Sequence, residues 1–141
     1  MTVDADRLFR LPDPKGVSGY IDWRLTPTGL EWDGRVFRAP WMPFACMRRI
    51  CLGHVPTLGG WRLGISGPPG RITIAAGHRE RPETAETVTE FRTLAHTVLE
   101  NAALAGCGTV LRRNFSRVRP DFLWIRLGQR VHSAKELADL L

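Results

Sequence analysis

The sequence predicts an α+β fold: a strongly bent antiparallel sheet or partly open barrel of six to seven strands, capped by one long amphipathic helix. Two observations support this prediction. As far as about residue 76, short segments of alternating polar and apolar residues are separated by turn-forming residues, which is typical of antiparallel strands. Beyond Pro82, apolar residues recur every three or four positions as far as Leu104, which is typical of a helix with one buried face.

The first strands are predicted from alternation and from one turn signal. A lead-in over residues 1–18 shows no clear period, so no strand is expected there. The segment "YIDWRL" (Tyr20–Leu25) alternates and predicts a half-buried strand. In "GLEWDGRVFRAPW" (Gly29–Trp41), the pair Asp33-Gly34 predicts a two-residue hairpin turn, because a type I′ turn needs positive φ at both central positions.

Further strands are expected before the helix. They are "CMRRICLGHV" (46–55), "WRLGI" (61–65) and "RITIAA" (71–76), and the last two are expected to pair across the turn-forming loop "SGPPG". Large aromatic side chains are expected to anchor the core: Trp23, Trp32 and Trp61.

One long helix is expected near residues 84–104. Its start has two candidates, since Thr87 and Glu90 fit the spacing of a capping box and Thr84 is an alternative N-cap. Its apolar stripe is predicted to consist of Val88, Phe91, Leu94, Ala95, Val98, Leu99 and Ala102.

Residues 105–141 are interpreted as a C-terminal extension of a single domain that spans residues 1–141. The segment "TVLRRNF" (109–115) is interpreted as a strand or an extended arm, and "DFLWIRL" (121–127) as a strand. A short C-terminal helix is expected in "SAKELADLL" (133–141), which opens with a capping-box pattern.

The order of these elements resembles that of the bacterial pleckstrin-homology-like (PH-like) domains. The matching segments are "LTPTGLEWDGRVFRAPW", "MRRICL", "GGWRLGI", "GRITIA" and the helix, so the resemblance covers roughly Tyr20–Leu104. The segment "WMPFACM" departs from the family pattern, which has a small polar or acidic residue and then an apolar residue after the tryptophan. The resemblance implies a sheet-plus-helix unit over residues 19–104, and a binding or scaffolding module for peptides, lipids or other subunits that needs no cofactor.

Composition and cysteine usage favour a cytoplasmic protein. The 141 residues carry a net charge of +6 and contain no run of about 18 apolar residues that would form a transmembrane segment. The N-terminal segment "MTVDADRLFR" has acidic residues where an export signal has an apolar stretch. The cysteines Cys46, Cys51 and Cys107 form no C-x-x-C pair, which favours reduced thiols over a disulfide frame or a zinc site.

No motif in the sequence indicates catalysis, so a non-enzymatic protein without a metal or cofactor is expected. The four histidines lack the spacing of metal ligands. Cys51 and His54 lie close together, but no third residue orients them, and structural thiols are favoured. The segment "GISGPPGR" (64–71) lacks the Lys-Ser/Thr and the following helix of a phosphate loop, which favours a hairpin loop.

The expected function is that of a binding or scaffold module for protein–protein interaction, including self-association through an edge strand or the segment Phe122–Leu127. Arginine supplies nearly all the positive charge, which reflects either a coding bias or a basic surface for phosphate. The candidate basic patch consists of Arg48, Arg49, Arg112, Arg113, Arg117 and Arg119, with Phe115 and Trp124 as aromatic contacts.

Two other ligand classes and an enzyme remain as alternatives. The segment 112–119 predicts nucleic-acid binding, because its arginines surround Phe115 and would neutralise backbone phosphates while the ring stacks on a base. Anionic lipid would suit the same arginines. A small enzyme that uses Cys51 or a histidine is the third alternative.

Overall fold

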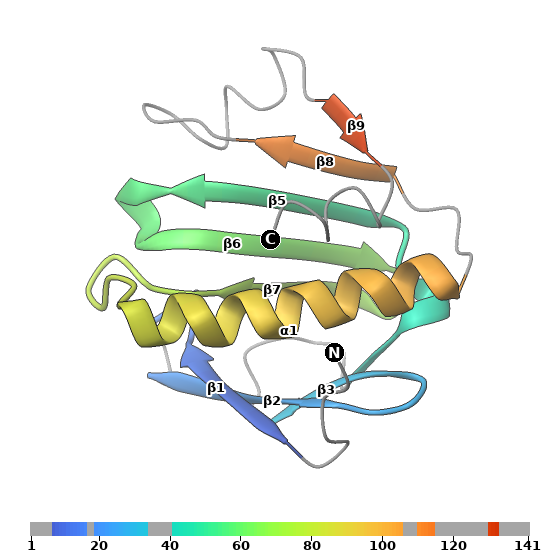
Figure 1. The fold of residues 1–141 in the computed structure, drawn as a ribbon, viewed down its shortest axis with the longest axis horizontal. Helices are drawn as coiled ribbons and strands as arrows, with labels where there is room; N and C mark the ends of the chain where they lie inside the picture. The colour runs from blue at the N-terminus through green and yellow to red at the C-terminus, as the bar shows by residue number, and fades with distance from the viewer. Residues whose placement is uncertain (1–6, 17–18, 34–40, 106–109, 115–129, 133–141) are drawn as a thin grey trace.

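The computed structural model (Figure 1) describes residues 7–16, 19–33, 41–105, 110–114 and 130–132. Within these residues the chain is α+β, with two sheets built mainly of antiparallel strands and one long helix. The predicted α+β class and the long helix are therefore confirmed. The predicted C-terminal helix over residues 133–141 lies outside the described residues.

Sheet A is a four-stranded antiparallel meander in the order β1-β2-β3-β4. Its strands are β1 (Leu8–Pro12), β2 (Tyr20–Leu25), β3 (Gly29–Asp33) and β4 (Trp41–Pro43). In β2, the side chains of Ile21, Trp23 and Leu25 are buried and alternate with more exposed ones, so the predicted pattern of this strand is confirmed.

β1 is a strand that the alternation pattern did not predict, because it lies in the lead-in, has only five residues and ends in a proline. Phe9 and Leu11 are fully buried, and all five residues pair with β2 in register. Pro12 is compatible with this strand because β1 lies at the edge of sheet A, where a missing amide hydrogen breaks no ladder. The lead-in over residues 1–18 therefore contributes a strand to the core.

The connection between β3 and β4 is longer than the predicted two-residue turn. Glu31 pairs with Trp41, whereas a two-residue turn at Asp33-Gly34 would pair Glu31 with Val36. Residues 34–40 themselves lie outside the described residues. The register of the two flanking strands therefore does not fit the turn that the Asp-Gly pair predicts.

Sheet B has the strand order β7-β6-β5-β8-β9. Its strands are β5 (Arg49–Val55), β6 (Gly60–Gly67), β7 (Gly70–Ala75), β8 (Val110–Asn114) and β9 (Arg130–His132). Neighbouring strands are antiparallel except β5 and β8, which run parallel. β6 and β7 pair across "SGPPG" as predicted, and β8 falls within the segment interpreted as a strand or an arm. The predicted strand over residues 121–127 lies outside the described residues.

The separation into two sheets corrects the prediction of one strongly bent sheet or partly open barrel. The four strands of sheet A are antiparallel, and so are the strands β5, β6 and β7 of sheet B. The described strands nevertheless form two separate sheets and do not close into a barrel. The break has a physical cause at the end of β4, where Pro43 lacks an amide hydrogen. The 3₁₀ turn η1 (Phe44–Cys46) then redirects the chain before β5 begins. This is the segment that departs from the PH-like pattern.

The helix α1 (Ala85–Leu104) begins at the alternative N-cap, Thr84. The Thr84 hydroxyl accepts a hydrogen bond from the Thr87 amide at 3.2 Å, and the Thr87 hydroxyl accepts one from the Thr84 amide at 2.8 Å. This capping box lies about one turn before the alternative predicted at Thr87 and Glu90. The prediction of a capping box at Thr87 and Glu90 is therefore wrong. The predicted apolar stripe is confirmed, with Val88 partly buried at its start.

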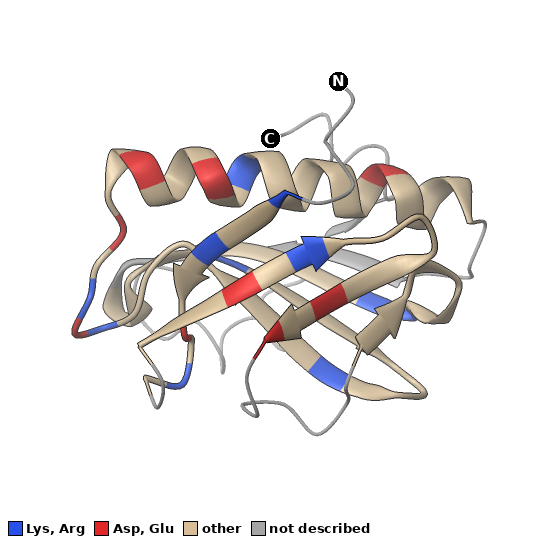
Figure 2. Cartoon of the chain, turned by 90° about the horizontal axis from the view of Figure 1, so that it is seen from below, with Lys and Arg blue, Asp and Glu red and all other residues tan. Residues whose placement is uncertain are grey.

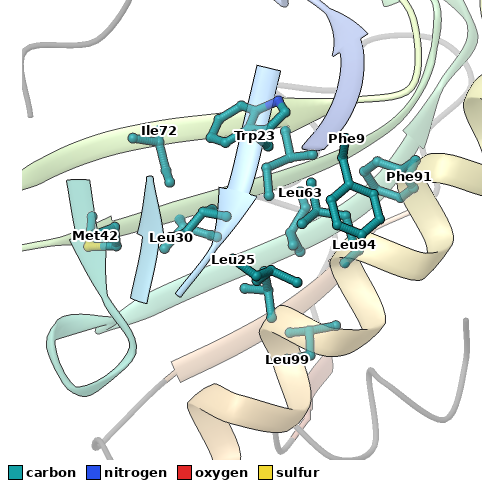
Figure 3. Packing of buried hydrophobic residues seen from close by; sticks show 14 of the residues in the cluster. Phe9, Trp23, Leu25, Leu30, Met42, Leu63, Ile72, Phe91, Leu94 and Leu99 are labelled. Atoms are coloured by element: carbon teal, nitrogen blue, oxygen red, sulfur yellow. The ribbon is translucent and has the colours of Figure 1, made fainter. Parts of the chain in front are cut away.

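A single hydrophobic core joins both sheets and the helix. Figure 1 shows α1 running along sheet B, and α1 contacts β1, η1, β6 and β7. Figure 3 shows Phe9 of β1 next to Phe91 and Leu94 of α1. Trp23 and Trp32 are buried with ring centroids 5.5 Å apart, while Trp61 is partly buried and stacks on Phe91 at 6.5 Å. All three predicted tryptophans therefore contribute to the core.

Candidate functional site

The outward side of sheet B carries arginines among small residues. In β5, β6 and β7, buried side chains such as Ile50, Leu63 and Ile72 alternate with outward ones, so position along the strand assigns each residue to a side. We call the outward positions the basic face. They are Arg49, Cys51 and Gly53 in β5, Arg62, Gly64 and Ser66 in β6, and Arg71, Thr73 and Ala75 in β7.

Arg49, Ser66 and Arg71 form one row across the basic face. The register pairs Arg49 with Ser66 and Ser66 with Arg71. Because neighbouring strands lie about 4.8 Å apart, the Cα atoms of the two arginines are about 10 Å apart with Ser66 between them. Both arginines are exposed and Ser66 is half-buried. The row therefore places two guanidinium groups on either side of a hydroxyl.

No carboxylate neutralises these arginines within the part of the chain that the structure describes. Elsewhere, Arg7 forms an ion pair with Glu90, and Arg24 forms one with Glu31. Arg49 and Arg71, by contrast, make no ion pair with any described residue. The basic face itself contains no aspartate or glutamate. Within the described residues, its positive charge is therefore not compensated.

The outward side of sheet A is mixed in sign. Asp22 pairs in register with Arg10 on one side and with Asp33 on the other, and Arg24 pairs with Glu31. Figure 2 shows acidic and basic residues interleaved on the strands of this sheet. The charges of sheet A largely compensate one another, whereas those of the basic face do not.

Small residues occupy the centre and one end of the basic face. Gly53, Gly64 and Ala75 have little or no side chain; Gly64 is half-buried, whereas Gly53 and Ala75 are buried. Among the described residues, a Cβ atom added at Gly64 would meet only the Cys51 carbonyl oxygen, at 3.9 Å, which is an ordinary van der Waals distance. The backbone of a ligand can therefore approach the sheet closely between the arginines.

Arg62 has a structural role at the border of the basic face. Its Nη2 atom donates a hydrogen bond to the Pro14 carbonyl oxygen at 3.1 Å, and its side chain is half-buried. This contact ties β6 to the loop between β1 and β2. We therefore do not count Arg62 among the arginines available to a ligand.

Four arginines of the predicted basic patch lie in β8, in β5 or just before β5. Arg48 and Arg49 are both exposed at the start of β5, and the Arg48 amide donates to the Ser66 carbonyl oxygen at 2.8 Å. The register of β8 sets the backbone of Arg112 beside Cys51 and that of Arg113 beside Leu52. The other predicted residues lie outside the described residues: Phe115, Arg117, Arg119 and Trp124.

Arg71 is missing from the predicted site, although the sequence contains the signal for it. The segment "RITIAA" alternates, and its isoleucines must face the core, so Arg71 must face outward. The hairpin at "SGPPG" then sets Arg71 opposite Ser66. Assigning Arg71 to the same row as Arg49 also needs the register of β5 against β6, which alternation alone does not determine.

Cys51 and His54 do not form the Cys–His pair considered from the sequence. Their separation of three residues places them on opposite sides of β5. His54 lies on the inner side, where its Nε2 atom is 2.9 Å from Oε1 of Glu83. The other carboxylate oxygen of Glu83 accepts a hydrogen bond from the Trp61 amide at 3.0 Å. This cluster fixes the start of α1 against sheet B.

Neither a metal centre nor a membrane-spanning helix is found in the described residues. No group of three or more His, Cys, Asp or Glu side chains among them is placed to hold a metal ion. None of the described helices combines the length and the apolar character needed to cross a membrane. Comparisons of the chain with protein-family models, with curated proteins and with solved structures found no match.

Proposed function

We propose that this protein is a non-enzymatic binding or scaffold module that docks an acidic segment of a partner protein on the basic face. The observation that carries the proposal is the row of exposed arginines, Arg49 and Arg71, which no carboxylate neutralises within the described residues. Arg48, just before β5, is also exposed, and its amide donates to the Ser66 carbonyl oxygen. The planar fork of arginine matches the geometry of carboxylate and phosphate groups, so such a row attracts an acidic ligand.

The flatness of the basic face favours a protein segment over a small molecule. Small ligands usually bind in concave pockets that bury most of their surface. Gly64 instead leaves the centre of the face open, and Thr73 beside it offers a hydroxyl group to a peptide backbone. Complementary charge would orient the incoming segment and raise its rate of association.

A partner of different sequence is favoured over self-association through an edge strand of sheet A. β1 ends in Pro12, and β4 has three residues and ends in Pro43. Short strands and prolines protect an edge against the addition of another strand. In sheet B the edge strand β7 contains no proline, but it contacts β1. A further route to self-association, through Phe122–Leu127, lies outside the described residues. A mass above that of the monomer in light scattering would reverse this preference.

We also propose, from the order of its elements, that the module is PH-like. The β2–β3–β4 meander, β5, the β6–β7 hairpin and the closing helix α1 follow one another in the order that the resemblance implies. A PH-like module would bind its partner without a cofactor. The binding surface still has to be argued from its residues, because fold alone does not determine function.

Nucleic acid is the second candidate ligand. β8 runs beside β5, so Arg112 takes the register position next to Cys51, close to Arg49. This arrangement would extend the basic face toward the segment 112–119. Binding of that kind depends on the release of counterions, so its affinity falls steeply with salt.

Fluorescence anisotropy with two labelled probes tests the proposal. The probes are a short peptide rich in Glu and Asp and a single-stranded oligonucleotide of similar length. We expect the peptide to bind, and Gly64→Glu to weaken its binding about tenfold, since one repulsive charge at the centre of the face costs about 1.4 kcal/mol. Thr89→Glu adds the same charge at an exposed position of α1, outside the basic face; it is the matched control and should leave the affinity unchanged.

The outcomes separate the two ligands. Tighter binding of the oligonucleotide, with affinity that falls steeply as salt rises, would favour nucleic acid. A peptide that does not bind, or that binds Gly64→Glu as well as it binds the original chain, would overturn the proposal.

A further inference from the structure

We propose that the row Arg49–Ser66–Arg71 binds a phosphate monoester, and that the docking segment of the partner therefore carries a phosphorylated serine or threonine. This inference rests on the proposed function, because it specifies the chemistry of the acidic segment. No other cluster on the described surface combines two arginines without acidic partners and a hydroxyl group in one row of a sheet.

The geometry of the row matches a tetrahedral group with several acceptor oxygens. Ser66 lies midway between Arg49 and Arg71, so a phosphate above Ser66 is approached by a guanidinium fork from each side. The Ser66 hydroxyl supplies a further donor from below. A phosphate monoester offers three strong acceptor oxygens, enough for both forks and the hydroxyl, whereas a carboxylate offers two.

The positive charge of the row also favours a phosphate over a single carboxylate. Arg49 and Arg71 carry two positive charges, and no described carboxylate lies on this face. A phosphate monoester carries a charge of about −1.5 to −2 near neutral pH, so it compensates both arginines of the row. A single carboxylate would leave one of them uncompensated.

The surroundings of the row favour a phosphate on a polypeptide over free phosphate. The row is flat and the two arginines are exposed, so a lone ion would remain largely hydrated there. A peptide adds contacts along the next row, where Gly64 leaves room for a backbone and Thr73 offers a hydroxyl group. The phosphate group would then fix the position of the peptide along the sheet, while Gly64 and Thr73 contact the peptide backbone.

Three peptides that differ at one central residue test the inference. An acidic host peptide carries serine, phosphoserine or glutamate at that position, and its affinity is measured by fluorescence anisotropy, with amide chemical shifts mapped by NMR. We expect the phosphoserine peptide to bind about tenfold more tightly than the serine peptide, and clearly more tightly than the glutamate peptide. The largest shifts should fall on β5, β6 and β7.

Arginine-to-lysine variants separate fork geometry from charge. Arg49→Lys and Arg71→Lys keep the charge but lose the bidentate fork, so each should remove most of the preference for phosphoserine. The matched control is Arg92→Lys, which changes an exposed arginine on α1, outside the basic face, and should leave the preference intact. A preference that survives both row variants would overturn the inference.

The remaining outcomes distinguish this inference from the proposed function. If all three peptides bind equally, the phosphate site is refuted while docking of an acidic segment stands. If no peptide binds, both are refuted. Vesicles of neutral lipid with phosphatidic acid provide the same phosphate chemistry from a membrane, and binding to them without binding to the phosphoserine peptide would also refute the inference.

Discussion

Gly59 and Gly64 differ in what an added side chain would meet. Gly59 has a φ of +100°, and a Cβ atom there would lie 2.5 Å from the His78 amide nitrogen. At Gly64, the nearest neighbour of a Cβ atom among the described residues is the Cys51 carbonyl oxygen at 3.9 Å. We expect Gly59→Ala to lower the free energy of unfolding by about 1–3 kcal/mol, and Gly64→Ala to raise it by about 0.4–1 kcal/mol. Urea denaturation measures both, and a destabilised Gly64→Ala would contradict the geometry.

Glu83 holds the start of α1 through both of its carboxylate oxygens. One accepts a hydrogen bond from the Trp61 amide and the other lies against His54. We expect Glu83→Ala to lower the free energy of unfolding by about 1–3 kcal/mol, because the Trp61 amide loses its acceptor. Glu83→Gln keeps an acceptor oxygen and should cost less. Glu86→Ala, at an exposed position in the first turn, is the control and should stay within about 1 kcal/mol.

At the scale of single residues, the sequence predicts burial better than it predicts neighbours. Alternation alone identifies Ile21 and Trp23 as buried, and it also shows that Arg49 and Ile50 face opposite sides. The row that joins Arg49 to Arg71 was not predictable in this way. It depends on how far β5 is shifted along β6, and that register follows from core packing rather than from either strand by itself.

At the scale of elements, local signals predict strands and the helix, and tertiary packing sets their limits. Apolar residues recur every second position in β6 and β7 and every three or four positions in α1, and both patterns are clear enough to identify these elements from the sequence. The short strand β1 was missed because two buried residues in five give too little periodicity to recognise. The predicted turn at Asp33-Gly34 does not fit the observed pairing of Glu31 with Trp41. The break between the two sheets depends on the turn η1, which the pattern of apolar residues does not predict.

The N-terminus of α1 provides a test that separates two capping arrangements. In the structure, Thr84 is the N-cap and exchanges hydrogen bonds with Thr87, so Thr84→Ala should lower the free energy of unfolding by about 1 kcal/mol. Glu90 would be essential in the capping box that the sequence suggested, but it forms an exposed ion pair with Arg7 instead. Glu90→Ala should therefore cost less than about 1 kcal/mol.

Urea denaturation followed by far-UV circular dichroism measures these differences. Thr89→Ala is the control, since Thr89 is exposed on the same helix and alanine is the better helix former. A larger loss for Glu90→Ala than for Thr84→Ala would contradict the observed N-cap.

At the scale of the whole molecule, one core makes the two sheets depend on each other. Trp23 and Leu30 from sheet A, Leu63 and Ile72 from sheet B, and Phe91 from α1 belong to one buried cluster. Figure 3 shows side chains from all three elements meeting in this cluster. Neither sheet has a separate core among the described residues, so neither can lose its packing without exposing apolar surface of the other.

This shared core predicts a single cooperative unfolding transition. Tryptophan fluorescence reports on the surroundings of the tryptophans, including the buried Trp23 and Trp32 of sheet A and Trp61 of sheet B, and far-UV circular dichroism reports on α1. We expect both signals to change at the same urea concentration. Phe91→Ala removes a fully buried ring between the helix and both sheets, so it should lower the free energy of unfolding by about 3–5 kcal/mol and move both transitions together.

Leu104→Ala is the matched control for this variant, because Leu104 lies on the same helix but is 85% exposed. It should change the free energy of unfolding by less than about 0.5 kcal/mol. If Phe91→Ala moved the circular dichroism transition and left the tryptophan transition in place, α1 would unfold independently of sheet A. The basic face would then belong to a separate unit built on sheet B, because Arg49, Ser66 and Arg71 keep their row only while the inward side of that sheet stays packed.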